Sequence, residues 1–118
     1  MPTPTLYRWS DIPTEQLNPL LQRQFLHGDQ AMLTRFHLAK GCIVPLHSHP
    51  NEQISYIVSG ALQFDFGNGD TRTVSAGEVL VIPGGVPHSA IATEDTLAFD
   101  IFAPPRQDWI EKTDAYLR

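Results

Sequence analysis

Apolar and polar residues alternate along short stretches of the chain, and turn-forming residues separate these stretches. Between Ala31 and Ala39 the alternation has a period near two, which is the period of a β-strand with one face turned inward. Ten prolines and eight glycines punctuate the sequence, and no amphipathic run long enough for a major helix precedes the C-terminal end. The pattern predicts an all-β sandwich or barrel.

The other predicted strands are short runs rich in β-branched and aromatic residues. They are 43–49, 53–58, 61–66, 72–75, 79–82, 88–92 and 96–102. Between two of them, the tetrad Gly67-Asn68-Gly69-Asp70 predicts a hairpin, because Asn-Gly readily adopts the positive φ values of tight turns. Toward the N-terminus, we expect residues 6–9 to be extended and 11–18 to form a turn of helix.

The length of 118 residues suffices for one hydrophobic core and is too short for two independent domains. Within this single domain, 1–30 is expected to supply an N-terminal strand and a connecting segment, and 31–104 the barrel core. Residues 105–118 are expected to form a short helix or irregular tail that packs on the barrel through Trp109 and Tyr116.

Charge and cysteine content exclude several classes of function. The net charge is −5 and the lysines and arginines are scattered singly, so no basic stripe exists to bind nucleic acid or an anionic membrane. The single cysteine, Cys42, cannot form an internal disulfide, and we expect it to pack as a small apolar group. The N-terminus is polar and proline-rich, without the apolar core of a signal peptide, so the protein is expected to be cytoplasmic.

Four residues have the spacing of a metal site. His47 and His49 are two apart on a predicted strand, so both side chains should leave the same face of the sheet. Gln53 follows after a short break, and His88 lies far downstream, so the four meet only if a barrel closes. His27 and His37 are outside this pattern and are interpreted as surface residues.

These positions belong to two longer motifs that resemble those of the cupin superfamily. The first motif comprises Gly41, the triplet His47-Ser48-His49, Gln53 and Gly60. The second comprises Gly77, Pro83, Gly85 and His88. The resemblance implies a single-domain cupin, which is a double-stranded β-helix or jelly-roll barrel, with His47, His49, Gln53 and His88 holding one divalent metal in the barrel mouth. The chain departs from the general motif at Gln53, where glutamate is usual, and at Ala92, where asparagine is frequent.

The donor set leaves the identity of the metal open. Nitrogen and oxygen donors suit iron, manganese, cobalt, nickel and zinc alike, whereas calcium and magnesium prefer all-oxygen sites. An amide oxygen from Gln53 brings no charge, so the metal would keep its full +2 charge and act as a stronger Lewis acid that binds less tightly. If the strand register differs by one residue, Glu52 replaces Gln53 as the ligand.

The end of the chain extends the resemblance to a smaller group. On the last predicted strand Asp100 and Phe102 point to the same face, and Arg106 follows just past the strand end. With these residues the segment from about Ala31 to Trp109 resembles the small single-domain cupins of the KdgF type, which act in pectin and alginate breakdown. The resemblance implies conversion of 4,5-unsaturated monouronates, which are sugar acids, to linear 5-keto-4-deoxyuronates without redox change.

The three residues near the end of the chain suit that chemistry. Arg106 can clamp the substrate carboxylate, Asp100 can shuttle a proton, and Phe102 can pack on the sugar face and exclude water. Two other functions remain open: a small metal-dependent dioxygenase and a non-catalytic module that senses a sugar acid or a metal. We also expect a homodimer, because an N-terminal apolar edge that includes Leu6 and Trp9, with Tyr7 between them, would be covered by pairing.

Overall fold

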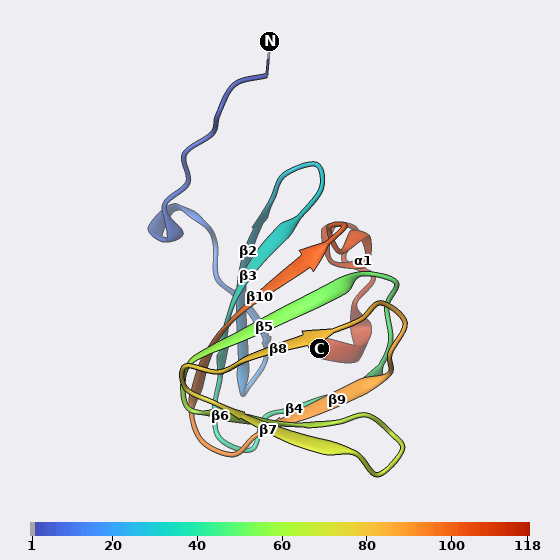
Figure 1. The fold of residues 1–118 in the computed structure, drawn as a ribbon. Helices are drawn as coiled ribbons and strands as arrows, with labels where there is room; N and C mark the ends of the chain where they lie inside the picture. The colour runs from blue at the N-terminus through green and yellow to red at the C-terminus, as the bar shows by residue number, and fades with distance from the viewer. Residues whose placement is uncertain (1) are drawn as a thin grey trace.

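The computed structural model describes residues 2–118, which contain ten β-strands and three short helical elements (Figure 1). The strands are β1 Glu15–Asn18, β2 Leu21–His27, β3 Met32–Leu38, β4 Ile43–His47, β5 Glu52–Ser59, β6 Ala61–Asp65, β7 Thr71–Ser75, β8 Val79–Ile82, β9 His88–Ala92 and β10 Thr96–Ala103. The helical elements are η1 Trp9–Asp11, α1 Gln107–Ile110 and η2 Ala115–Leu117. The all-β prediction is confirmed.

The strands form two antiparallel sheets that face each other across the core. One sheet has six strands in the order β1-β2-β3-β10-β5-β8, and the other has four in the order β4-β9-β6-β7. Figure 1 shows the smaller sheet below the larger one, with the chain crossing repeatedly between them. Consecutive strands therefore often belong to different sheets, as in a jelly-roll barrel.

Period-two alternation explains why the sheets have a buried face. On β3, Met32, Thr34, Phe36 and Leu38 are buried, whereas His37 is exposed. On β10, buried positions alternate with more exposed ones in the same way along the whole strand. The inward positions form one core that includes Ile57, Leu62, Phe64, Val74, Ala98 and Phe102. Burial of this apolar surface is the main free energy that holds the two sheets together.

The register of the central strands determines which residues share the open end of the barrel. In the antiparallel pair β10·β5, Phe102 lies opposite Gln53 and Asp100 lies opposite Ser55. In the pair β4·β9, His47 lies opposite His88. Residues that are far apart in the sequence therefore meet at one end of the sandwich.

The N-terminal segment differs from the prediction. Leu6 and Tyr7 lie outside any strand. The helical turn expected over 11–18 is displaced to η1, which ends at Asp11, and the second half of the range forms the strand β1. The turn after β1 forms because the Asn18 side-chain oxygen accepts a hydrogen bond from the Leu20 amide at 2.9 Å. This turn allows β1 to pair with β2, so tertiary pairing determines the structure of a segment with weak local preference.

Other local predictions are confirmed. Residues 67–70 connect β6 and β7, with Gly67 and Gly69 both at positive φ. The Phe66 amide donates to the Asp70 carbonyl and closes the hairpin. Cys42 is buried, as expected of a small apolar group, and His27 is exposed. Within residues 2–118, no helix has the length and apolar character needed to cross a membrane.

Candidate metal centre

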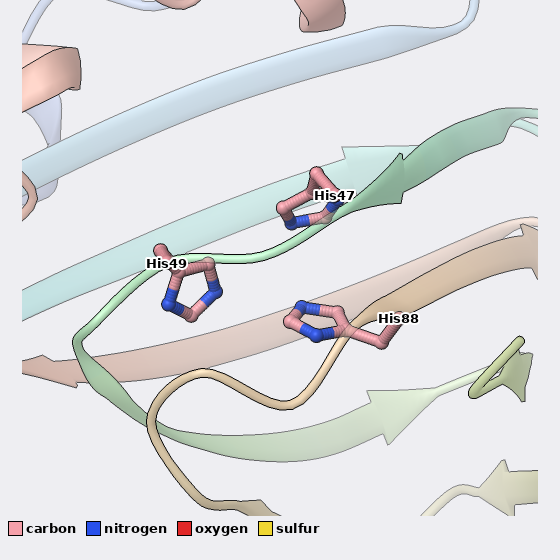
Figure 2. Close-up of side chains that lie close together, drawn as sticks. All are labelled: His47, His49 and His88. Carbon is pink, nitrogen blue, oxygen red and sulfur yellow. The ribbon is translucent and has the colours of Figure 1, made fainter.

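Three histidines meet at the open end of the barrel. His47 ends β4, His88 begins β9 and His49 lies in the loop after β4; Figure 2 shows their rings facing one another. One nitrogen of each ring lies within 4.8 Å of the corresponding nitrogens of the other two. Three imidazole nitrogens this close can share one metal ion.

His49 reaches the cluster by a different route from the one predicted. The strand was expected to run from 43 to 49, but β4 ends at His47, and His49 belongs to the loop. The pairing of β4 with β9 shifts between Val44 and His47, so the strand is already irregular before it ends. The side chain of His49 is nevertheless buried and turned to the same interior as His47.

Contacts between two loops fix the position of His49 relative to His88. The Gly85 amide donates to the His49 carbonyl at 2.8 Å. A Cβ atom at Gly84 would collide with the Pro50 carbonyl oxygen, so only glycine allows the two loops to approach this closely. Gly84 thus has a steric role in bringing the two halves of the site together.

Backbone carbonyls orient all three imidazole rings in the same way. The Nδ1 atoms of His47, His49 and His88 lie 2.7, 3.0 and 2.9 Å from the carbonyl oxygens of Pro45, Asn51 and Val86. Donation from each Nδ1–H leaves the Nε2 lone pair available as a metal ligand. Among the described residues, the buried His88 Nε2 has no hydrogen-bond partner. This unpartnered atom fits a metal that binds there.

The electrostatics of the cluster favour neutral rings. Burial is the largest effect and lowers the pKa of His47 and of His49 to about 4, with the nearby Arg106 charge also contributing. Burial also lowers the pKa of His88. At neutral pH the three imidazoles are therefore unprotonated, which is the form that binds a metal.

Gln53 adds an oxygen donor to the same cluster. Its Oε1 lies 3.1 Å from His49 Nε2, while its Nε2 donates to Ser55 Oγ at 2.9 Å. Two ligand atoms at right angles on one ion, each bonded at about 2.1 Å, are about 3 Å apart. Gln53 is buried on the inner face of β5 and the neighbouring Glu52 is exposed, so the register supports Gln53 over Glu52 as a fourth ligand.

Asp100 lies deeper in the same cavity and is only partly paired. It accepts a hydrogen bond from Ser55, but its buried Oδ1 has no partner among residues 2–118. Burial raises the pKa of Asp100 to about 6, against the opposing effects of Ser55 and of the Arg106 charge. The opposite strand contributes Thr34, whose buried Oγ1 also lacks a partner in the described chain. A carboxyl with a pKa near neutrality can both accept and return a proton.

Arg106 lies in the cavity wall, and most of its hydrogen bonds are made within the protein. Its Nε and Nη2 bind the two carboxylate oxygens of Asp108 at 2.9 and 2.7 Å, and Nη2 also donates to the Tyr116 hydroxyl at 2.7 Å. Burial by itself lowers the pKa of Arg106, but the contacts with Asp108 and Tyr116 raise it overall, so the group stays cationic. The Arg106 guanidinium was expected to clamp a substrate carboxylate. Its Nε–Nη2 edge is instead occupied by the Asp108 carboxylate.

Phe102 closes the cavity beside the histidines. The ring is buried and meets the His49 ring edge-on at 5.6 Å and the Trp109 ring at 4.9 Å. The cavity is lined by His47, Gln53, His88, Asp100, Phe102, Arg106, Trp109 and Tyr116, and by apolar side chains deeper in the barrel. Three of the four predicted metal ligands are in this lining, and His49 is not. All three predicted catalytic residues are in it.

Sequence reasoning missed two residues of the site. Ser55 shares the inner face of β5 with Gln53, and the period-two alternation could have identified it. Tyr116 was assigned only to packing, yet its ring lies 4.7 Å from the His47 ring at the edge of the cavity. No sequence spacing indicates this contact, because Tyr116 belongs to the irregular segment after β10.

Asn51 connects the loop of His49 to the segment of Arg106. Its side-chain nitrogen donates to the Pro104 carbonyl at 2.6 Å and to the Pro105 carbonyl at 3.2 Å. These bonds hold the end of β10 beside the metal-site loop. The position of Arg106 relative to the histidines thus depends on this cross-link.

Comparison with protein families and solved structures supports the same interpretation of the fold. A family model described as Cupin domain matches residues 34–102, which contain all four candidate metal ligands. Two solved structures match nearly the whole chain. KdgF from Halomonas sp. is 29% identical with a TM-score of 0.82, covering 91% of this chain and 99% of that one. An RmlC-like cupin from Shewanella frigidimarina is 25% identical with a TM-score of 0.81, covering 91% and 96%.

Other proteins match part of the chain or share only its fold. Oxalate decarboxylase from Bacillus subtilis superposes with a TM-score of 0.76 at 19% identity, which shows the fold alone. Among curated proteins, the auxin-binding protein ABP19b of Prunus persica is 30% identical over 98 residues. That match covers 75% of this chain and 47% of the relative, and the chain likewise spans about half the length of the related auxin-binding protein ABP19a.

Proposed function

The chain belongs to the cupin family, and on this premise we propose that it is a metal-dependent enzyme that opens the ring of 4,5-unsaturated monouronates. The product would be the linear 5-keto-4-deoxyuronate. The observation that supports this most strongly is one cavity that combines His47 and His88 of the histidine cluster, the buried Asp100 and the cationic Arg106. The similarity to KdgF over nearly the whole length of both chains supports the same reaction.

The reaction requires one proton transfer and no oxidant. The anomeric hydroxyl of the substrate loses its proton while the bond between C1 and the ring oxygen breaks, which leaves an aldehyde at C1. The electrons of that bond remain on the former ring oxygen, and the C4=C5 double bond becomes an enolate. A proton added at C4 then gives the ketone at C5. Substrate and product are isomers, so one group that accepts and returns a proton is sufficient.

Asp100 is the residue assigned to this transfer. As a carboxylate it would accept the proton of the anomeric hydroxyl, and as a carboxylic acid it would return the proton to C4. Its pKa of about 6 makes both forms accessible near neutral pH. Ser55 donates to the carboxyl and would hold it in place during both steps.

The other residues of the cavity would bind and orient the substrate. Arg106 would attract the substrate carboxylate, and Phe102 would pack on the sugar ring and exclude water. A divalent metal held by His47, His49, Gln53 and His88 would supply Lewis-acid polarisation of the ring oxygen or carboxylate.

The test is the rate at which the protein removes the conjugated double bond of 4,5-unsaturated galacturonate, followed by ultraviolet absorbance. We expect the metal-loaded protein to accelerate the loss without oxygen uptake, and the metal-stripped protein and a His88→Ala variant to lose this activity. His37→Ala is the matched control, because His37 is exposed and does not line the cavity.

Each of the other outcomes excludes the proposed reaction. Oxygen uptake coupled to substrate loss would show a dioxygenase instead. Binding of the sugar acid without turnover by a fully metallated sample would show a sensor module. The expected cytoplasmic location and homodimer are separate predictions, and sedimentation of the purified chain tests the second of them.

A further inference from the structure

Tyr116 brings a hydroxyl group from the C-terminal segment to the edge of the cavity. The residue lies in η2, and its ring packs against the His47 ring with 4.7 Å between centroids. Its hydroxyl oxygen accepts hydrogen bonds from Arg106 Nη2 at 2.7 Å and from the Trp109 indole nitrogen at 3.3 Å. Arg106, Trp109 and Tyr116 all line the cavity that contains the histidines.

The hydrogen-bond inventory of this corner leaves the Tyr116 proton unused. Guanidinium and indole N–H groups are donors only, so neither Arg106 nor Trp109 can accept a proton from the Tyr116 hydroxyl. The two hydrogen bonds fill the lone pairs of the hydroxyl oxygen, and within residues 2–118 no other group accepts its hydrogen. Tyr116 is therefore a fixed donor that lacks an acceptor.

Arg106 has unused donors next to this hydroxyl. The Nε hydrogen binds Asp108, and the two Nη2 hydrogens bind Asp108 and Tyr116. Only the Nη1 amino group has no hydrogen bond assigned in the described chain. Asp108 accepts from Nε and Nη2 of Arg106, but no acceptor in the described chain faces the cationic Nη1 group or the neutral Tyr116 hydroxyl. Two such donors are complementary to a group that only accepts, and a carboxylate is such a group.

We infer that Tyr116 is a specificity-determining residue that binds the substrate carboxylate jointly with Arg106. One carboxylate oxygen would accept a hydrogen bond from Arg106 Nη1 and the other from the Tyr116 hydroxyl. Arg106 alone would then not bind both carboxylate oxygens. This inference rests on the proposed function, since it takes the ligand to be a sugar acid. It predicts that a sugar with a hydroxymethyl group instead of the carboxylate binds weakly.

The experiment compares two saturated sugars, D-galacturonate and D-galactose, which the proposed reaction cannot consume. Their dissociation constants are measured by isothermal titration calorimetry on zinc-loaded wild type, Tyr116→Phe and Tyr56→Phe. Tyr116→Phe removes the hydroxyl and keeps the ring against His47. Tyr56→Phe is the matched control, because it removes a hydroxyl from the exposed outer face of β5.

We expect the wild type to prefer galacturonate, and Tyr116→Phe to raise its dissociation constant about 10- to 100-fold, the effect of one hydrogen bond to a charged group. Binding of galactose should not change, and Tyr56→Phe should behave as the wild type. An unchanged dissociation constant for galacturonate, or an equal loss of affinity for both sugars, would overturn the inference. Tighter galacturonate binding by Tyr116→Phe would also overturn it, because the hydroxyl would then compete with the carboxylate for Arg106.

A double-variant cycle provides a second measurement. Arg106→Lys removes the Nη1 donor, and the combination with Tyr116→Phe should weaken galacturonate binding by less than the product of the two single effects, because both donors contact one carboxylate. If the two substitutions weaken galacturonate binding independently, the inference that both donors contact one carboxylate is wrong. Failure of the proposed reaction is distinguishable: the unsaturated substrate would not be consumed, while galacturonate binding would still depend on Tyr116.

Discussion

Two buried arginines contact the same tryptophan in different electrostatic surroundings. The guanidinium carbons of Arg23 and Arg106 each lie 4.5 Å from the centre of the Trp109 ring. Arg23 is fully buried between the carboxylates of Asp114, at 2.8 Å, and Glu15, at 3.1 Å. Arg106 is nearly as buried but pairs with one carboxylate, that of Asp108, and borders the cavity of the histidines.

The buried aspartates of the two regions differ in the same way. Burial raises the pKa of Asp114, but the ion pair with Arg23 reverses this effect, so that the pKa of Asp114 is lowered overall. Burial raises the pKa of Asp100 to about 6, and no ion pair reverses it. Both aspartates are buried, and their pKa values shift in opposite directions because only one of the two carboxylates has a cation in contact.

This difference separates a structural charge cluster from a functional one. Around Arg23 the charges neutralise one another and join β1, β2 and the C-terminal segment. Around Arg106 and Asp100, the buried Asp100 Oδ1 has no hydrogen-bond partner among the described residues, the carboxylate makes no ion pair there, and both side chains line a cavity. Such unsatisfied groups lower stability and leave partners available for a ligand.

Removing Arg23 should have the largest effect on stability. We expect Arg23→Ala to lower the free energy of unfolding by about 3–5 kcal/mol, because Asp114 would keep a buried charge without its main partner. Urea denaturation measures this change. Arg72→Ala is the control, since Arg72 forms an exposed pair with Asp70 and should change stability by less than about 1 kcal/mol. Equal losses in both variants would contradict the assignment of Arg23 to a structural cluster.

Removing the charge of Asp100 should raise the free energy of unfolding, whereas removing Arg23 should lower it. The folded state of the metal-free protein retains the Asp100 proton up to about pH 6, whereas the unfolded chain releases it near the ordinary value of 3.8, so stability falls as pH rises through this window. Asp100→Asn lacks this penalty. We expect it to be more stable than wild type above pH 7 by up to about 3 kcal/mol.

Chemical denaturation of both proteins in chelator, from pH 4 to 8, tests this prediction. The groups that face Asp100 are Ser55 on β5, Thr34 on β3, Arg106 and the histidines of the cavity, and none of them is changed by the substitution. The advantage of the variant should vanish near pH 4. A constant difference across the range would point to packing instead of titration.

Metal binding should stabilise the mouth of the barrel. A divalent metal at one hundred times its dissociation constant should raise the free energy of unfolding by about 2.7 kcal/mol, because it binds only the folded chain. Thermal unfolding with and without zinc measures this gain. His88→Ala should lose the gain, while Arg23→Ala should keep it despite its lower baseline. Equal stabilisation of wild type and His88→Ala would place the metal elsewhere.

Removing Arg106 should affect function more than stability. Arg106→Gln is expected to lower kcat/KM for the unsaturated uronate about 30-fold, equivalent to about 2 kcal/mol of lost binding to a charged group. Its partner Asp108 is partly exposed and can be hydrated, so the stability loss should be smaller than for Arg23→Ala. A variant that loses stability as strongly as Arg23→Ala and retains its activity would remove the distinction between the two clusters.

The sequence predicted the fold class and the site residues where short-range periodicity and motif spacing apply. The alternation over 31–39 corresponds to the buried and exposed faces of β3, and Gln53 is inward as its register requires. Prediction failed over 11–18, where local preference favoured a helical turn and pairing with β2 produced a strand. It also placed His49 on a strand, because the irregular end of β4 depends on contacts with a distant loop.

By itself, the sequence determined the alternation that gives each strand an inward face and the spacing that places the histidines at strand ends, because both depend on neighbours within a few residues. The tertiary structure alone decided which inward polar groups meet and which are neutralised. Asp100 and Asp114 are both buried aspartates, but only Asp114 contacts a guanidinium. An opposite charge favours the carboxylate most strongly within about 4–6 Å, so this choice depends on how segments from distant parts of the chain are packed.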